Sequence, residues 1–175
     1  MDLQIFEARY LDMVSRCFKR DETFLIMPLE SGPESGLGDL RFAAMGCEAQ
    51  IIDWQQRDNG FLGLRIEGRR RGQVSAVEVA ADGLVSAQVR WIEEPPDQVL
   101  AVEHEDLRAL HAALLDHPIA QGLGLPALAD SQQQLGYELA FLLPFSLDQK
   151  AILLATESPG ARLQQISEWL ELMQA

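Results

Sequence analysis

The chain has 175 residues and a mass of 19.5 kDa, and its 47% hydrophobic content is enough for one domain or two small lobes with a buried core. With 27 acidic and 14 basic residues, its formal net charge of -13 disfavours nucleic acid and anionic membranes as partners. Only two cysteines are present, which excludes a disulfide framework and a four-ligand zinc site.

Targeting and membrane signals are also missing from the sequence. No apolar run approaches the roughly 20 residues of a transmembrane helix. The opening letters MDLQIFEARY have neither the basic start nor the apolar centre of a signal peptide. These features predict a cytoplasmic protein that does not associate with membranes.

The first residues combine two periodicities. Leu3 and Ile5 alternate with polar residues, as in a strand. Leu11, Val14 and Phe18 then recur at helical spacing. We therefore predict a strand that runs almost directly into a helix.

The chain up to about Asp97 has mostly the pattern of strands. The predicted strands are Phe24–Leu29, Ala43–Asp53, Phe61–Gly68, Gly72–Ala80 and Leu84–Glu94. Glu30–Asp39 is rich in Gly, Ser and Pro and predicts an exposed loop. The triplet Arg69-Arg70-Arg71 lies between two glycines, which predicts a hairpin there. Its charges are explained by a solvated turn or by a patch that binds an acidic partner. A small, strongly bent sheet or partial barrel is expected.

A lobe boundary is predicted at Glu93–Asp97, because two prolines there cannot donate to a sheet. The boundary divides the chain into residues 1–97 and 98–175. Beyond it the apolar residues follow helical spacing, which predicts a small bundle. Ser146 and Gln149 have the spacing of a capping box, and Ser158 precedes Pro159 at another helix start.

Candidate catalytic and metal groups have simpler interpretations. No phosphate-loop motif is present. Ser146 and Lys150 could form a nucleophile and a base, but the serine already has a capping role. His104 and His111 are seven residues apart, whereas helical metal ligands prefer three or four, so we expect exposed histidines. No catalytic residue, metal site or cofactor is expected.

Large aromatic residues lie at predicted strand ends and at the lobe boundary. Trp54 ends one strand, Phe61 begins the next, and Trp91 lies near the boundary. Such side chains commonly fill a core, but they also build surfaces that bind a partner. Both roles stay open.

Several stretches resemble one family in the expected order. The stretch IFEARYLDMV is similar to the strand-to-helix signature of the amino-terminal substrate-binding domain of the ATP-dependent protease Lon, which also occurs as a stand-alone protein. Further similar stretches are DETFLIM, MGCEAQIID, DNGFLGLRIEGRRR, LVSAQVRWIEE and YELAFLLPFSLDQKAILLATESPGARLQQISEWL. The resemblance covers nearly the whole chain. Ala8, Gly72 and Ala155 depart from the usual proline, aromatic residue and glutamate.

The resemblance implies an α+β fold with a PUA-like β pseudo-barrel lobe containing one helix, followed by a small α-helical bundle. It also implies non-catalytic binding of an unfolded polypeptide or a partner protein. The alternative is an RNA-binding PUA-like module, which would need a concentrated basic face. A cryptic hydrolase would need a cleft in which a carboxylate or Ser146 meets a base. The candidate partner-binding residues are Trp54, Phe61, Trp91, Leu3 and Ile5.

The resemblance also bears on the first strand. Relatives begin further upstream with an apolar strand that pairs inside the β-lobe. Without it, the strand near Leu3 to Phe6 would have one unpaired edge. We therefore expect this strand to be exposed on one side or to contact a second copy, as in a homodimer formed through an open β edge.

Overall fold

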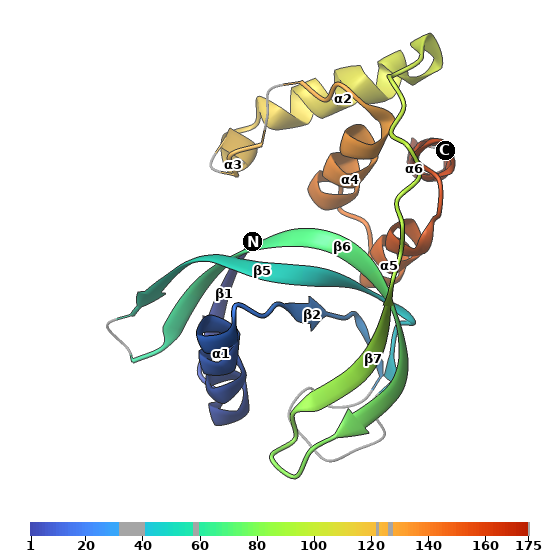
Figure 1. The fold of residues 1–175 in the computed structure, drawn as a ribbon. Helices are drawn as coiled ribbons and strands as arrows, with labels where there is room; N and C mark the ends of the chain where they lie inside the picture. The colour runs from blue at the N-terminus through green and yellow to red at the C-terminus, as the bar shows by residue number, and fades with distance from the viewer. Residues whose placement is uncertain (32–40, 58–59, 122, 126–127, 175) are drawn as a thin grey trace. The chain divides into compact units, whose positions relative to one another are not determined.

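The structure is a computed structural model that describes residues 1–31, 41–57, 60–121, 123–125 and 128–174. The chain divides into two compact units, Met1–Glu93 and Glu94–Ala175. The first unit combines antiparallel strands with a helix, and the second is helical (Figure 1). The predicted α+β class is confirmed.

The first unit is built around one bent antiparallel sheet. Its described elements are β1 (Asp2–Ile5), α1 (Ala8–Arg20), β2 (Phe24–Ile26), β3 (Leu29–Ser31), β4 (Arg41–Phe42), β5 (Met45–Gln56), β6 (Leu62–Val79) and β7 (Val85–Trp91). The main sheet has the order β1-β6-β5-β2, and β7 pairs with the far part of β6. Strands β3 and β4 form a separate two-stranded sheet.

Strand β6 runs without interruption through the arginine triplet. The predicted hairpin at Arg69-Arg70-Arg71 is therefore wrong, because these residues lie inside a strand that continues from Leu62 to Val79. Figure 1 shows β6 curving along its length. The register with β5 shifts between Cys47 and Ala49, so Arg69 and Arg70 together lie opposite Glu48. This β-bulge bends the strand and keeps the ladder on both sides of it.

The glycines beside the triplet permit close packing and do not form a turn. A Cβ atom on Gly72 would lie 2.5 Å from Cγ1 of Val89 and 3.1 Å from the Trp91 ring on β7. A Cβ atom on Gly68 would lie 3.0 Å from Sγ of Cys47 on β5. Side chains of the neighbouring strands thus occupy the space beside each glycine.

Helix α1 covers one face of the sheet with its apolar stripe. Val14 is buried against Ala49, Leu64 and Ile66 of the sheet. Asp21 ends the helix in the left-handed conformation with φ 53°, and its backbone N–H donates to Cys17 O. The predicted passage from strand to helix is confirmed, with only Phe6 and Glu7 between β1 and α1.

Strand β1 lies at an edge of the sheet. It pairs with β6 through Leu3 opposite Leu64 and Ile5 opposite Leu62. Among the strands that the structure describes, none lies on its other side. This agrees with the expected exposed edge, whereas contact with a second copy stays a prediction.

The second unit is a bundle with an apolar centre. Its described elements are η1 (Val102–His104), α2 (Glu105–Leu115), α3 (Pro118–Gln121), α4 (Gln132–Leu142), α5 (Leu147–Ala155) and α6 (Pro159–Gln174). Leu135, Leu139, Leu163 and Ile166 are fully buried in its core. The predicted capping box is confirmed, since Gln149 N donates to the Ser146 hydroxyl at 3.2 Å and Ser146 N donates to Oε1 of Gln149 at 2.9 Å.

Two buried polar side chains, His111 and Arg162, connect helices of the bundle. His111 was expected to be exposed, but it is buried, because its helical face is the one that carries Leu107 into the core. Its Nε2 lies 2.6 Å from Oε2 of Glu138 on α4. Arg162 is also fully buried and donates to the backbone oxygens of Leu153 at 3.0 Å and Thr156 at 2.8 Å. These contacts join α2 to α4 and α5 to α6.

Membrane-spanning elements and metal clusters can be assessed within the described residues. None of the helices there is both long and apolar enough to span a lipid bilayer. No group of three histidine, cysteine, aspartate or glutamate side chains in the same residues could hold a metal ion.

The close approach at Gly72 gives a first prediction. Gly72→Ala should lower the free energy of unfolding by about 1–3 kcal/mol, because the new methyl group overlaps Val89. Urea unfolding measures this change. The control is Ser86→Ala on the exposed side of β7, which should change stability by less than about 0.5 kcal/mol. Equal stability of the two variants would contradict the packing role of Gly72.

Candidate functional site

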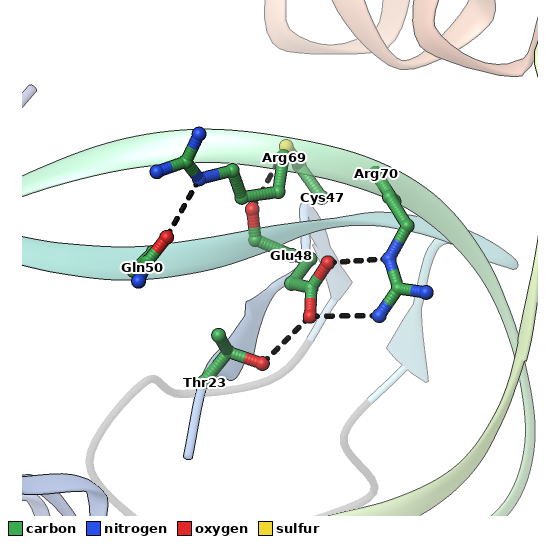
Figure 2. Close-up of polar contacts among 6 residues, drawn as sticks. All are labelled: Thr23, Cys47, Glu48, Gln50, Arg69 and Arg70. Carbon is green, nitrogen blue, oxygen red and sulfur yellow. Dashed lines mark hydrogen bonds and ion pairs between the residues drawn. The ribbon is translucent and has the colours of Figure 1, made fainter. Parts of the chain in front are cut away.

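A polar cluster forms where the bulge of β6 faces β5. Glu48 is 6% exposed. Its Oε2 accepts from Nε of Arg70 at 2.7 Å, and its Oε1 accepts from Nη2 of Arg70 at 3.1 Å and from the Thr23 hydroxyl at 2.8 Å. Figure 2 shows this fork around the carboxylate, with Arg69 turned to the neighbouring Gln50. These contacts connect the start of β2 with β5 and β6.

The cluster fixes the charge states of its members. The hydrogen bonds from the Arg70 guanidinium hold the pKa of Glu48 below its usual range, with a further contribution from Thr23. The same carboxylate raises the pKa of Arg70. A buried carboxylate that accepts three hydrogen bonds is well satisfied. The cluster is therefore suited to holding strands together.

Trp91 extends this cluster to β7. The Arg70 guanidinium lies over the Trp91 ring, 4.3 Å from its centroid. Trp91 also packs above Gly72 and keeps 37% of its surface exposed. This candidate partner residue is thus engaged with the sheet on one side.

The arginine triplet is not a free basic patch. Arg69 contacts Gln50 and Glu67, at 2.7 and 3.1 Å. Arg70 binds Glu48, and Arg71 is buried. The interpretation as a solvated turn is therefore wrong, because the three residues lie within a strand, whereas a patch for an acidic partner stays a prediction.

Four aromatic residues lie towards the other end of the sheet, where β5 and β6 meet in a hairpin, and we call their two ring pairs together the aromatic surface. They form two pairs: Phe6 with Phe61, at 5.3 Å between ring centroids, and Phe18 with Trp54, at 6.0 Å. Phe6, Phe18 and Trp54 are 62%, 46% and 58% exposed, and Phe61 is half-buried. The side chains come from α1, β5 and the residues next to β1 and β6.

The register of the sheet explains how each pair forms. Trp54 pairs with Leu64, and Leu64 pairs with Leu3, so all three side chains point to the face covered by α1. Phe18 reaches Trp54 from the end of that helix. Phe6 follows Ile5, which pairs with Leu62 beside Phe61. Tertiary structure thus brings together residues that are far apart in the sequence.

The five candidate partner-binding residues therefore have three different environments. Trp54 and Phe61 belong to the aromatic surface. Leu3 and Ile5 are partly buried and pack against the core beneath α1. Trp91 lies apart from them, against Arg70.

Sequence analysis missed Phe6 and Phe18 as members of the surface. Phe18 was assigned to the apolar stripe of the first helix, seven residues after Leu11. The exposure of both Leu11 and Phe18 shows that they lie at the margin of that stripe. Phe6 had no signal of its own, because it lies between β1 and α1.

Comparison with known proteins gives matches over nearly the whole chain. Residues 1–171 match the family model of the ATP-dependent protease La (LON) substrate-binding domain. The chain is similar to the crystal structure of a Lon N-terminal domain protein from Xanthomonas campestris, with 33% identity and a TM-score of 0.75, covering 97% of this chain and 88% of that chain. It shares the fold of the N-terminal domain of Mycobacterium avium complex Lon protease, with 19% identity and a TM-score of 0.63, covering 97% and 89% of the two chains. No curated protein matches its sequence.

The Glu48 cluster gives a second prediction, on pH. Because the folded-state pKa of Glu48 is lowered, its stabilising contribution is present in full above the unfolded-state pKa of about 4.3. The contribution is lost as the pH falls through the lower folded-state value. Glu48→Gln should reduce the free energy of unfolding by about 1–3 kcal/mol at pH 7, and this difference should shrink below about pH 4.

Denaturant unfolding at pH 7 and at several acidic pH values measures the difference between the two proteins. The matched control is Glu67→Gln, which removes an exposed ion pair with Arg69 and should cost less than about 1 kcal/mol. A Glu48→Gln difference that is constant down to pH 2 would show that the carboxylate charge does not stabilise the sheet.

Proposed function

Because this chain belongs to the LON substrate-binding domain family, we propose that it binds exposed stretches of polypeptide through the aromatic surface. Affinity comes from apolar contacts with the rings, and no covalent step is involved. The partner is an unfolded polypeptide or an exposed segment of another protein. The family supplies the general role, and the arrangement of the rings supports the location.

The observation that supports this location is the exposure of three large rings on a rigid support. Phe6, Phe18 and Trp54 are each close to half exposed or more, although Trp54 comes from strand β5 and Phe18 from a helix packed on the sheet. Aromatic side chains bury a large apolar area at a small cost in side-chain entropy, so they are frequent hot spots of interfaces. Rings held in pairs need little further ordering when a partner binds.

Other candidate residues have supporting roles in the proposal. Leu3 and Ile5 pack against the core of the first unit and stabilise the sheet that carries Trp54. Trp91 stays a candidate contact through its exposed part, separate from the aromatic surface. We further propose that residues 1–97 and 98–175 are two lobes of one substrate-binding domain, since the family match spans both.

The RNA-binding alternative has less support. The arginine triplet is the densest run of basic residues in the sequence, and Arg69 and Arg70 are engaged by Gln50, Glu67 and Glu48. The net charge of -13 also opposes a phosphate backbone. Polypeptide remains the favoured ligand class.

A third prediction tests the aromatic surface. Trp54→Ala combined with Phe18→Ala should weaken binding of a reduced, carboxymethylated client protein by about tenfold or more, because two contact rings are removed. Fluorescence anisotropy with the labelled client measures the dissociation constant.

The matched control for this test is Phe141→Ala on α4, which removes a ring that is 53% exposed in the other unit. Circular dichroism confirms that each variant is folded. Unchanged client binding by the double variant, with binding by the original chain intact, would place the polypeptide site elsewhere.

A fourth prediction concerns the absence of catalysis. The purified chain should hydrolyse neither ATP nor casein above the rate of buffer, because we propose a binding module without a reaction. A coupled phosphate assay and a fluorescent casein assay measure both rates. Activity that follows the chain through two further chromatographic steps would refute the non-catalytic proposal.

A further inference from the structure

The second unit contains an extended segment, Asp97–Ala101, that is fixed beside the start of α4, and we call it the strap. Val99 forms an isolated antiparallel β-bridge with Ser131, and the backbone N–H of Gln132 donates to Gln98 O at 2.9 Å. The Gln132 side-chain amide donates to Val99 O at 3.3 Å. The strap therefore has a defined backbone path although it is neither a helix nor a strand.

The strap directs one apolar residue inward and others outward. Leu100 packs against the core of the bundle. Val99 is 82% exposed, and Val102, at the start of η1, is 92% exposed. No other large hydrophobic residue in the described part of the chain is as exposed as these two. A fixed backbone thus presents two valines to solvent.

Acidic side chains follow the valines directly. Glu103 and Glu105 have side chains that are 76% and 66% exposed, and Asp106 is also exposed. We call Val99, Val102 and these three acids the acidic apolar surface. Within the described segment 97–108, the basic side chains are His104 and Arg108, which lie 3.6 Å from Glu103 and 3.5 Å from Glu105.

The charge of the whole unit has the same sign. Residues 94–175 contain 12 acidic and three basic side chains, which gives a net charge of -9, and one of the three basic residues, Arg162, is buried. The local acids therefore lie in a negative field. An acidic peptide, a nucleic acid or a second copy of this acidic unit would meet repulsion at this surface.

We propose that the acidic apolar surface binds a polypeptide segment in which lysine or arginine residues alternate with aliphatic residues. The aliphatic side chains cover Val99 and Val102 and remove their surface from water. The cationic side chains pair with Glu103, Glu105 and Asp106 at the rim, where charge determines selectivity and the rate of association. This surface lies in a different unit from the aromatic surface and selects by charge as well as by apolarity.

Two labelled synthetic peptides of 12 residues test the proposal on the full chain. In both peptides every second residue is aliphatic, either leucine or valine. The residues between them are lysine in one peptide and glutamate in the other. The lysine peptide should bind at least about tenfold more tightly than the glutamate peptide in anisotropy titrations, and moderate salt should weaken its binding. Equal affinity of the two peptides would overturn the proposal.

Variants locate the binding. Val99→Ser combined with Val102→Ser should lower the affinity for the lysine peptide about tenfold. The melting temperature should not fall, because both side chains are exposed. Glu103→Gln, Glu105→Gln and Asp106→Asn together should reduce the dependence on salt. The control is Leu172→Ser, which changes an apolar residue of the same unit that is 74% exposed and should leave the affinity unchanged.

Three results would contradict this assignment. The first is unchanged affinity of both multiple variants for the lysine peptide. The second is that Trp54→Ala abolishes binding of the lysine peptide while the two valine substitutions do not. That result would place the basic segment on the aromatic surface. The third is a dimer in sedimentation experiments that dissociates when Val99 and Val102 are changed, since the surface would then bind a second copy.

Discussion

The backbone ladder of β6 is the constraint on which the first unit depends. One edge of this strand bonds to β5 from Leu62 to Gln73. The opposite edge is shared by β1 at its start and by β7 from Gly72 onward. A break in β6 would therefore separate three strands at once. The bulge opposite Glu48 and the small residues near it allow the strand to curve while its backbone groups stay paired.

The same ladder explains which features of the fold could be predicted. Local signals were enough for the passage from β1 to α1 and for the Ser146 capping box, because each depends on residues within a few positions of one another. They failed at Arg69-Arg70-Arg71, where two flanking glycines have the local appearance of a turn. The actual role of Gly72 depends on Val89 and Trp91, which come from another strand. The expectation that His111 is exposed was wrong for a related reason, since its burial depends on helix packing and on its contact with Glu138.

Prediction of the candidate site had the same limits. Trp54 and Phe61 could be selected because they lie at strand ends in the sequence. Their partners Phe18 and Phe6 follow from register and from the position of α1, which a linear pattern does not contain. Trp91 was selected for its place near the boundary, but its environment depends on where the bulge directs Arg70. Composition predicted the acidic character of the chain, whereas the outward direction of Val99 follows from the fixed path of the strap.

The pairing of β1 with β6 also has a consequence for synthesis of the protein. Leu3 pairs with Leu64, so the first strand leaves the ribosome long before its partner exists. At about 5–20 residues per second, the delay is roughly 3–12 seconds. During that time Leu3 and Ile5 have no ladder to join, while helix α1 can already form because its contacts are local. On the nascent chain these two apolar residues thus stay without their ladder partners until the β5–β6 hairpin has been translated.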